Sequence, residues 1–65
     1  MITTEDILEA FDSLGGTVET VQALQLHLEA MFPGRFDEII DAITLAILNG
    51  DLIKLNEKMI FKRNK

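Results

Sequence analysis

The residues of this chain that could carry out chemistry are few, and each stands alone. His27 is the only histidine, Ser13 is the only serine, and there is no cysteine. With no cysteine and no second histidine, the chain offers too few suitable ligands for a zinc site. Ser13 has no base near it in the sequence that could activate its hydroxyl group. We therefore expect no catalytic residue, no metal site and no cofactor, and a protein that acts by binding rather than as an enzyme.

Charged side chains are the remaining candidates, and they are unevenly distributed. Residues 1–50 contain one basic residue against nine acids, a net charge of −8, whereas residues 51–65 contain five basic residues against two acids, a net charge of +3. The five basic residues are Lys54, Lys58, Lys62, Arg63 and Lys65. Such a segment could contact phosphates without reading a base sequence. Lysines on an edge hairpin also prevent edge-to-edge aggregation, so both explanations remain open.

The composition is that of one small folded domain, which we place at residues 1–65. Apolar residues make up 48% of the chain, too many for a disordered segment. No apolar run approaches the roughly 18 residues that a membrane-spanning helix needs. The start of the chain, Met1 to Asp6, lacks the basic region and apolar core of a secretion signal. We expect a cytoplasmic protein that makes no contact with a membrane.

The first two helices are predicted from their caps and their apolar spacing. Thr3 and Thr20 can each cap a helix, because a threonine hydroxyl accepts a hydrogen bond from an otherwise unpaired backbone N–H. Apolar residues then recur at helical spacing. The stripe of the first helix is Ile7, Leu8, Phe11 and Leu14, and that of the second is Val21, Leu24, Leu28 and Met31. Gly15-Gly16 ends the first helix, and Phe32-Pro33-Gly34 ends the second.

A third helix is predicted from Phe36 or Asp37 to Asn49, with Gly50 just past its end. Its inner stripe is Phe36, Ile39, Ile40, Ile43 and Ile47. Leu45 and Leu48 fall outside this stripe, near Asp41. They are either peripheral core residues or the centre of an exposed apolar patch.

A hairpin of two short strands is predicted after Gly50, from Asp51 to Leu55 and from Met59 to Arg63. One register sets apolar residues opposite each other and opposite charges together, as cross-strand pairs prefer. It pairs Leu55 with Met59, Ile53 with Phe61 and Asp51 with Arg63. The segment Thr17-Val18-Glu19 is a candidate third strand, so the sheet has two strands or three.

This register also predicts the loop and the faces of the hairpin. The loop Asn56-Glu57-Lys58 contains no glycine, so Asn56 is expected in the left-handed conformation that such loops require. Lys54 and Lys62 are expected on the outer face of the hairpin, together with Leu52 and Ile60.

The segment Ile47 to Ile53 resembles the passage from the recognition helix into the first wing strand of the winged helix-turn-helix superfamily. Thr17 to Leu24 likewise resembles the strand and cap that open the second helix of that superfamily. The resemblance covers nearly the whole chain. It implies a small α+β winged helix: three helices followed by an antiparallel wing. Winged helices commonly bind DNA, with the third helix in the major groove and the wing on the backbone.

The residues of the third helix do not favour DNA reading. Base edges are normally contacted by Arg, Lys, Asn or Gln, whereas the outward positions here include Asp37, Glu38, Asp41 and Thr44. Arg35 is the only basic residue near this helix. Acids in a first helical turn are stabilised by the helix dipole, which explains Asp37 and Glu38 but not Asp41.

The leading prediction is a non-enzymatic protein–protein interaction module: a small adaptor, inhibitor or regulator that binds through the third helix. Its candidate binding residues are Asp37, Glu38, Asp41, Leu45 and Leu48. The partner is another protein or a second copy in a homodimer. The alternative is a transcription regulator that contacts DNA phosphates through the wing and tail, with weak or nonspecific binding expected. The candidate residues for that contact are Arg35, Lys54, Lys58, Lys62, Arg63 and Lys65.

Overall fold

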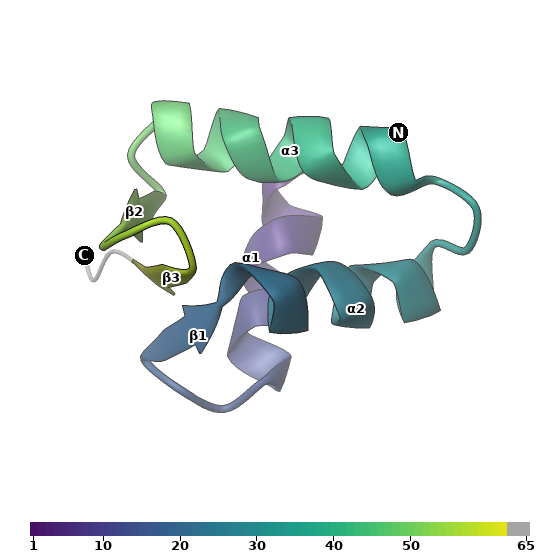
Figure 1. The fold of residues 1–65 in the computed structure, drawn as a ribbon. Coiled ribbons are helices and arrows are strands. Elements are labelled where there is room, and N and C mark those ends of the chain that lie inside the picture. Colours follow the sequence, from purple (N-terminus) through teal and green to yellow (C-terminus); the bar gives the residue numbers. More distant parts are fainter. Residues whose placement is uncertain (63–65) are drawn as a thin grey trace.

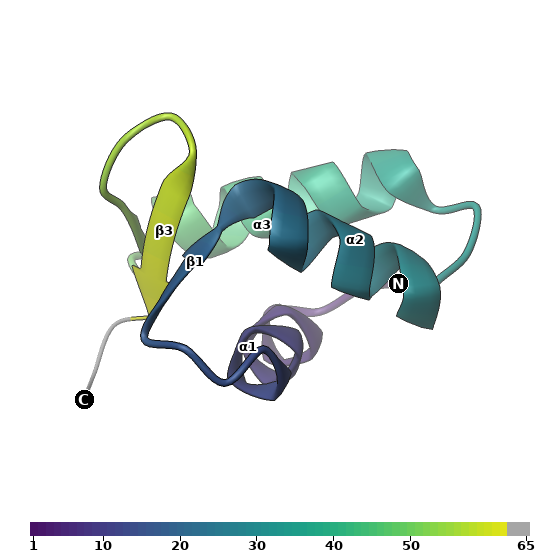
Figure 2. The ribbon, with the colours of Figure 1, turned by 60° about the horizontal axis from the view of Figure 1, so that its bottom comes forward.

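Three helices and a three-stranded antiparallel sheet form this α+β fold, as the sequence predicts. The computed structural model describes residues 1–62, so Arg63 and Lys65 lie outside the described residues. The helices are α1 (Thr4–Ser13), α2 (Val21–Met31) and α3 (Phe36–Leu48). The strands are β1 (Val18–Thr20), β2 (Leu52–Lys54) and β3 (Met59–Lys62). The sheet stands at one end of the molecule, beside the helices, and α1 lies behind α2 and α3 in Figure 1; Figure 2 shows the same arrangement from below.

Both predicted helix caps are confirmed. The hydroxyl oxygen of Thr3 accepts a hydrogen bond from the N–H of Asp6 at 3.2 Å, and the Asp6 carboxylate accepts one from the Thr3 N–H at 2.9 Å. This reciprocal pair satisfies two donors at the start of α1. The hydroxyl oxygen of Thr20 accepts a bond from the Ala23 N–H at 3.0 Å and so caps α2.

Glycines end α1 and α3 where the sequence predicts. Gly15 and Gly50 both have a φ of +82°, a conformation that glycine adopts without steric cost. At the end of α3 the Gly50 N–H donates to the Ile47 carbonyl at 3.1 Å, and the Asp51 N–H donates to the Ala46 carbonyl at 2.9 Å. These two bonds turn the chain out of α3 and directly into β2.

The core lies between the three helices and one face of the sheet. Its largest fully buried side chains are Phe11, Ile7, Leu24, Leu28, Ile39, Leu52 and Ile60. Met31 and Phe36, which the predicted stripes include, do not belong to it, since Met31 is 42% exposed and Phe36 is 55% exposed. Met31 is the last residue of α2 and Phe36 the first of α3, so both flank the turn between these helices. Phe32, within that turn, packs against the core instead.

The sheet has the order β1-β3-β2, so the candidate strand near Val18 is a true third strand. Ile53 pairs with Phe61, which confirms the predicted hairpin register, and the Leu55 N–H donates to the Met59 carbonyl at 2.9 Å. On the other side of β3, Val18 pairs with the same Phe61. The predicted pair of Asp51 with Arg63 lies outside the described residues.

The hairpin loop is stabilised by a different interaction from the one predicted. No residue other than glycine has a positive φ among residues 1–62, so the expectation of a left-handed Asn56 is wrong. The Asn56 side-chain oxygen instead accepts hydrogen bonds from the N–H groups of Lys58 at 2.8 Å and Met59 at 3.0 Å. A side-chain acceptor of this kind replaces the backbone conformation that glycine would supply.

The faces of the hairpin are the reverse of the prediction. Leu52 is 1% exposed and Ile60 is fully buried, so they face the helices and are not on the outer face. Lys54, the last residue of β2, is on the same side of the strand as Leu52 but is exposed, next to the loop. The alternation failed as a guide because both faces of the strands carry apolar residues.

Candidate functional site

The side of α3 that points away from the core carries acids and leucines. We call Asp37, Glu38, Asp41, Leu45 and Leu48 the α3 outward face, and all five are exposed. Leu45 is 54% exposed and Leu48 is 75% exposed, so neither is a core residue. Residues three and four apart are neighbours on a helix surface, which places Asp41 next to both Leu45 and Glu38. The structure therefore brings together all five residues that the sequence proposed for protein binding.

This face is polarised along the helix. Its acids occupy the first two turns and its leucines the last turn. No side chain caps the start of α3, so Asp37 and Glu38 are the groups that offset its positive dipole end. Asp41 lies beyond the first turn and has no such function in the helix. Thr44 is also exposed, but its hydroxyl donates to the Ile40 carbonyl at 2.9 Å and is engaged within the helix.

Arg35, which directly precedes α3, is paired with an acid of this face. The Arg35 Nε lies 3.4 Å from the Glu38 Oε2, with the two side chains 48% and 49% exposed. A half-exposed pair of this kind contributes at most about 1 kcal/mol to stability. The pair also changes the charge of the surface, because Glu38 offsets the positive charge of Arg35 at the start of α3.

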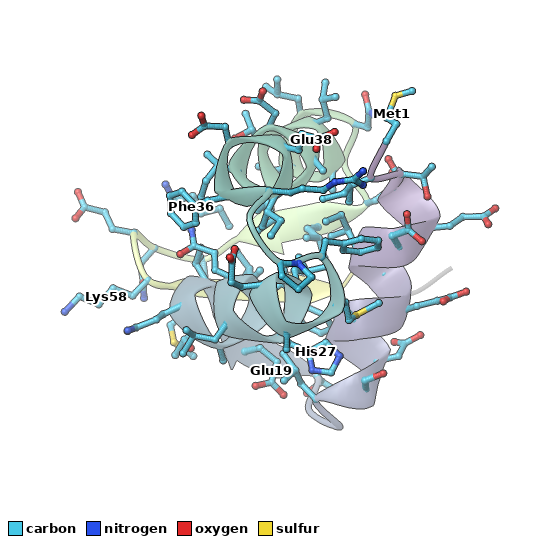
Figure 3. The ribbon with its side chains drawn as sticks, turned by 90° about the vertical axis from the view of Figure 1, so that its right-hand side faces the viewer. Met1, Glu19, His27, Phe36, Glu38 and Lys58 are labelled. Carbon is cyan, nitrogen blue, oxygen red and sulfur yellow. The ribbon has the colours of Figure 1, made fainter. Side chains whose placement is uncertain are left out.

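A hollow of about 220 Å³ lies beside Leu45. It is lined by Met1, Ile2, Glu38, Asp41, Ala42 and Leu45. Figure 3, viewed along α3, shows Met1 and Glu38 together on one side of the helix and Phe36 on the opposite side. With buried Ile2 and Ala42 below and two acids at its edge, the hollow fits an apolar side chain that has a basic neighbour. Met1 was missed from the sequence because it precedes the first helix and has no periodic partner.

The basic candidates whose side chains the structure describes lie at two separate places. Lys54 and Lys58 are exposed in the hairpin, whereas Arg35 lies at the opposite end of α3, roughly 20 Å away at 1.5 Å per helical residue. For Lys62 the structure describes the strand backbone, and Arg63 and Lys65 are not described.

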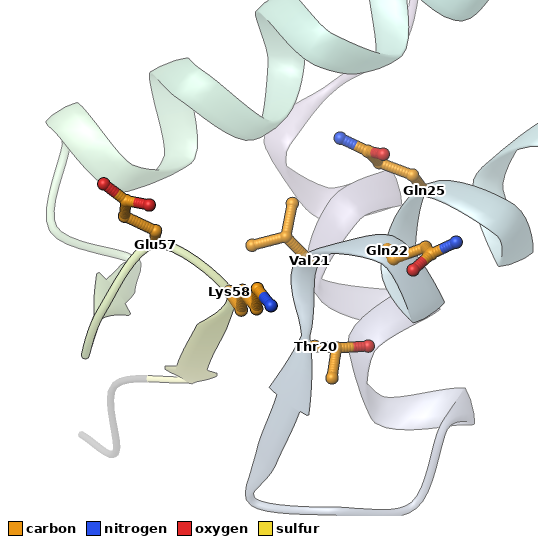
Figure 4. A pocket seen from close by; sticks show the side chains of 6 residues that line it. All are labelled: Thr20, Val21, Gln22, Gln25, Glu57 and Lys58. Atoms are coloured by element: carbon orange, nitrogen blue, oxygen red, sulfur yellow. The ribbon is translucent and has the colours of Figure 1, made fainter.

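The hairpin loop is tied to the start of α2. The Lys58 carbonyl accepts a hydrogen bond from the Val21 N–H at 2.8 Å. An open hollow of about 320 Å³ lies at this junction, lined by Thr20, Val21, Gln22, Gln25, Glu57 and Lys58 (Figure 4). Lys58 there stands beside Glu57 and two glutamines rather than beside further lysines, so this junction is not a cluster of positive charge.

The sheet contributes a second exposed apolar surface that the sequence prediction missed. We call Val18, Ile53, Leu55, Met59 and Phe61 the outer sheet face. Strand alternation places them on the side opposite Leu52 and Ile60. Val18 is 43% exposed, Leu55 is 52% exposed, and Met59 and Phe61 are partly buried. The available signal was the runs Leu52-Ile53 and Met59-Ile60-Phe61, in which neighbouring residues on opposite faces are all apolar.

Neither a nucleophile nor a metal site is apparent among residues 1–62. The Ser13 hydroxyl donates to the Glu9 carbonyl at 3.0 Å, within its own helix. Among residues 1–62 no three histidine or acidic side chains come together in a way that could hold a metal ion. Over the same residues no helix has the length and apolarity to cross a membrane.

Comparisons with protein-family models, with curated proteins and with solved structures gave no match to this chain.

Proposed function

We propose that this protein is a winged-helix module that acts by protein–protein binding through the α3 outward face. The observation that supports this proposal is the exposure of Leu45 and Leu48, one turn apart, on the helix that would otherwise enter a DNA groove. A small domain has little reason to expose two neighbouring leucines unless a partner covers them. The acids of the same face give the partner its chemistry: an electropositive surface with an apolar centre.

In such a contact the leucines would contribute affinity and the acids would contribute specificity. Full burial of a leucine side chain contributes about 1.5–3 kcal/mol, and Leu45 and Leu48 each retain more than half of their surface for a partner to cover. Asp37, Glu38 and Asp41 would mainly direct the encounter and select a basic partner, because charges at the rim of an interface affect association rate and specificity more than affinity.

The same residues oppose DNA binding by α3. Unit charges about 4 Å apart interact by about 1 kcal/mol even in water, so acids beside phosphates carry a cost. The positive charge that could offset it, on Arg35, lies within a pair with Glu38.

The second candidate function is phosphate contact through the wing by a DNA-binding regulator. The exposure of Lys54 and Lys58 favours it. Binding of this kind depends on charge alone, so we expect it to be weak at physiological salt and indifferent to sequence.

The test compares leucine variants in an affinity capture from host extract. We expect wild-type protein to retain a basic partner that Leu45→Glu does not retain. Leu26→Glu is the matched control, because Leu26 is 64% exposed on α2. Fluorescence anisotropy against random duplexes and a selected-sequence pool examines the alternative. Specific sites are typically bound with dissociation constants of about 10⁻⁸–10⁻¹¹ M, and affinity in that range for one sequence would replace the proposal with the regulator.

A further inference from the structure

The chain leaves α3 through an asparagine–glycine pair, Asn49-Gly50. Asn49 is exposed and directly follows α3, where the chain turns toward β2 (Figure 1). An asparagine followed by glycine is especially prone to lose its side-chain amide without an enzyme, because glycine has no Cβ that would shield its backbone nitrogen. The turn itself favours glycine at this position, since Gly50 has a φ of +82°. The end of α3 therefore contains a chemically reactive pair.

The reaction needs only these two residues and water. The Gly50 backbone nitrogen bonds to the Asn49 Cγ, the bond from Cγ to Nδ2 breaks, and the side-chain nitrogen leaves as ammonia with the proton of the Gly50 N–H. Water then opens the resulting succinimide ring at one of its two carbonyls. Opening at Cγ yields aspartate. Opening at the main-chain carbonyl yields isoaspartate, in which the main chain runs through Cβ and Cγ.

The folded structure holds the pair in a geometry that prevents ring closure. The Gly50 N–H donates to the Ile47 carbonyl at 3.1 Å, and the Asp51 N–H donates to the Ala46 carbonyl at 2.9 Å. Asn49 has a ψ of −7°, which turns the Gly50 nitrogen toward the backbone nitrogen of Asn49 and away from its Cβ. Ring closure therefore requires a rotation about ψ of Asn49 that breaks the Gly50 hydrogen bond and moves Asp51 away from α3.

We infer that Asn49 is a site of spontaneous deamidation and isomerisation, which the junction between α3 and β2 closes in the folded protein. The reaction proceeds only in molecules whose junction is open, so its rate follows the local opening of this end of α3. The aspartate product adds a negative charge at the negative end of the helix dipole. The isoaspartate product inserts an additional carbon into the main chain between the hydrogen-bonded groups. Each product weakens the junction, so a chain that has opened is marked irreversibly.

Peptide mapping by mass spectrometry during incubation at mildly alkaline pH tests the inference. Trypsin cleaves after Arg35 and Lys54, which separates Asn49 from Asn56; the latter is followed by Glu57 and is the internal control. In guanidinium chloride we expect Asn49 to lose its amide at least about tenfold faster than Asn56, because only Gly50 lacks a side chain. In the folded protein the rate at Asn49 should be at least about tenfold lower than in guanidinium chloride, since only the open minority reacts.

Leu52→Ala separates the stability of the junction from the chemistry of the pair. It leaves Asn49 and Gly50 unchanged but removes a fully buried side chain from β2. In buffer it should accelerate the loss of the amide at least about threefold, and in guanidinium chloride it should leave the rate unchanged. Leu26→Ala is the matched control, because Leu26 is 64% exposed on α2, and it should change neither rate. If Leu52→Ala is unfolded, wild-type protein in denaturant below its unfolding transition replaces it, with a rate that should rise as the junction opens.

Three results would overturn the inference. Equal rates at Asn49 in folded and denatured protein would show that the junction does not close the site. A rate at Asn49 no higher than that at Asn56 in guanidinium chloride would show that the pair is not reactive. A folded Leu52→Ala that loses the amide as slowly as wild type would show that opening of the junction does not control the reaction.

Discussion

The helices and the sheet distribute their apolar residues differently. In α1 and α2 the helical repeat assigns most apolar residues to one buried side, with Ile7 and Leu24 at its centre. In β2 and β3 apolar residues occupy both sides, and only the tertiary packing decides that Leu52 is buried and Ile53 half-exposed. A helical stripe thus identifies its own inner face, whereas a strand that is apolar throughout does not. In the sheet, therefore, residue type alone does not separate the buried positions from the exposed ones.

The largest expected effect comes from substituting neighbours on the two faces of β2. Leu52→Ala should lower the free energy of unfolding by about 2–5 kcal/mol, because it removes a fully buried side chain and leaves a cavity. Ile53→Ala should cost about 1 kcal/mol, since 38% of this side chain is already exposed. Urea unfolding followed by circular dichroism at low protein concentration measures both. Equal losses would contradict the assignment of the faces.

The next largest effect on stability is expected at Gly50, where the chain passes from α3 into β2. Gly50→Ala should destabilise the protein by about 1–2 kcal/mol, because a side chain strains the left-handed conformation at a φ of +82°. Gly16→Ala is the control: Gly16 does not have this φ, and the atoms closest to an added side chain are those of the flexible Glu19 carboxylate. Thermal unfolding of the two variants should show the smaller decrease in melting temperature for Gly16→Ala.

A smaller effect is expected in the hairpin loop. Asn56→Ala removes the acceptor of two backbone N–H groups and should cost about 1 kcal/mol, the usual net contribution of such hydrogen bonds. Asn49→Ala, at the end of α3, is the matched control and should change stability by less than about 0.5 kcal/mol. Chemical denaturation is again the measurement. A neutral Asn56→Ala would mean that the loop holds its shape without the side chain.

The smallest effect on stability should accompany a large effect on binding. Asp41→Lys should alter the free energy of unfolding by less than about 0.5 kcal/mol, because Asp41 is exposed and lies beyond the first turn of α3. It should nevertheless weaken capture of a basic partner and strengthen retention on DNA. Glu9→Lys, an exposed position on α1, makes the same change in net charge and should do neither. Equal behaviour of the two variants would assign the effects to net charge alone.

Local chemistry explains which features could be predicted from the sequence. The caps at Thr3 and Thr20, the glycine after α3 and the pairing of Ile53 with Phe61 each depend on residues close together in the chain. Met31 and Phe36 were misassigned because their exposure depends on where neighbouring elements end.

The exposed apolar surfaces were predictable to a different extent. All five residues of the α3 outward face follow from the helical repeat of one segment. The hollow beside Leu45 and the outer sheet face could not be predicted, because Met1 and Val18 join them only through the tertiary fold.

The pairing of β1 with β3 has a consequence for the order of folding. Thr20 and Met59 are opposite each other in the sheet, so the chain between them, which contains all of α2, α3 and β2, is a closed loop. Closing a long loop is slow relative to forming a helix or a hairpin, because its entropy must be lost before the contact gains any energy. We expect the helices and the β2–β3 hairpin to form first and β1 to join last. Pulsed hydrogen exchange during refolding should then show the amides of β1 gaining protection last among the three strands.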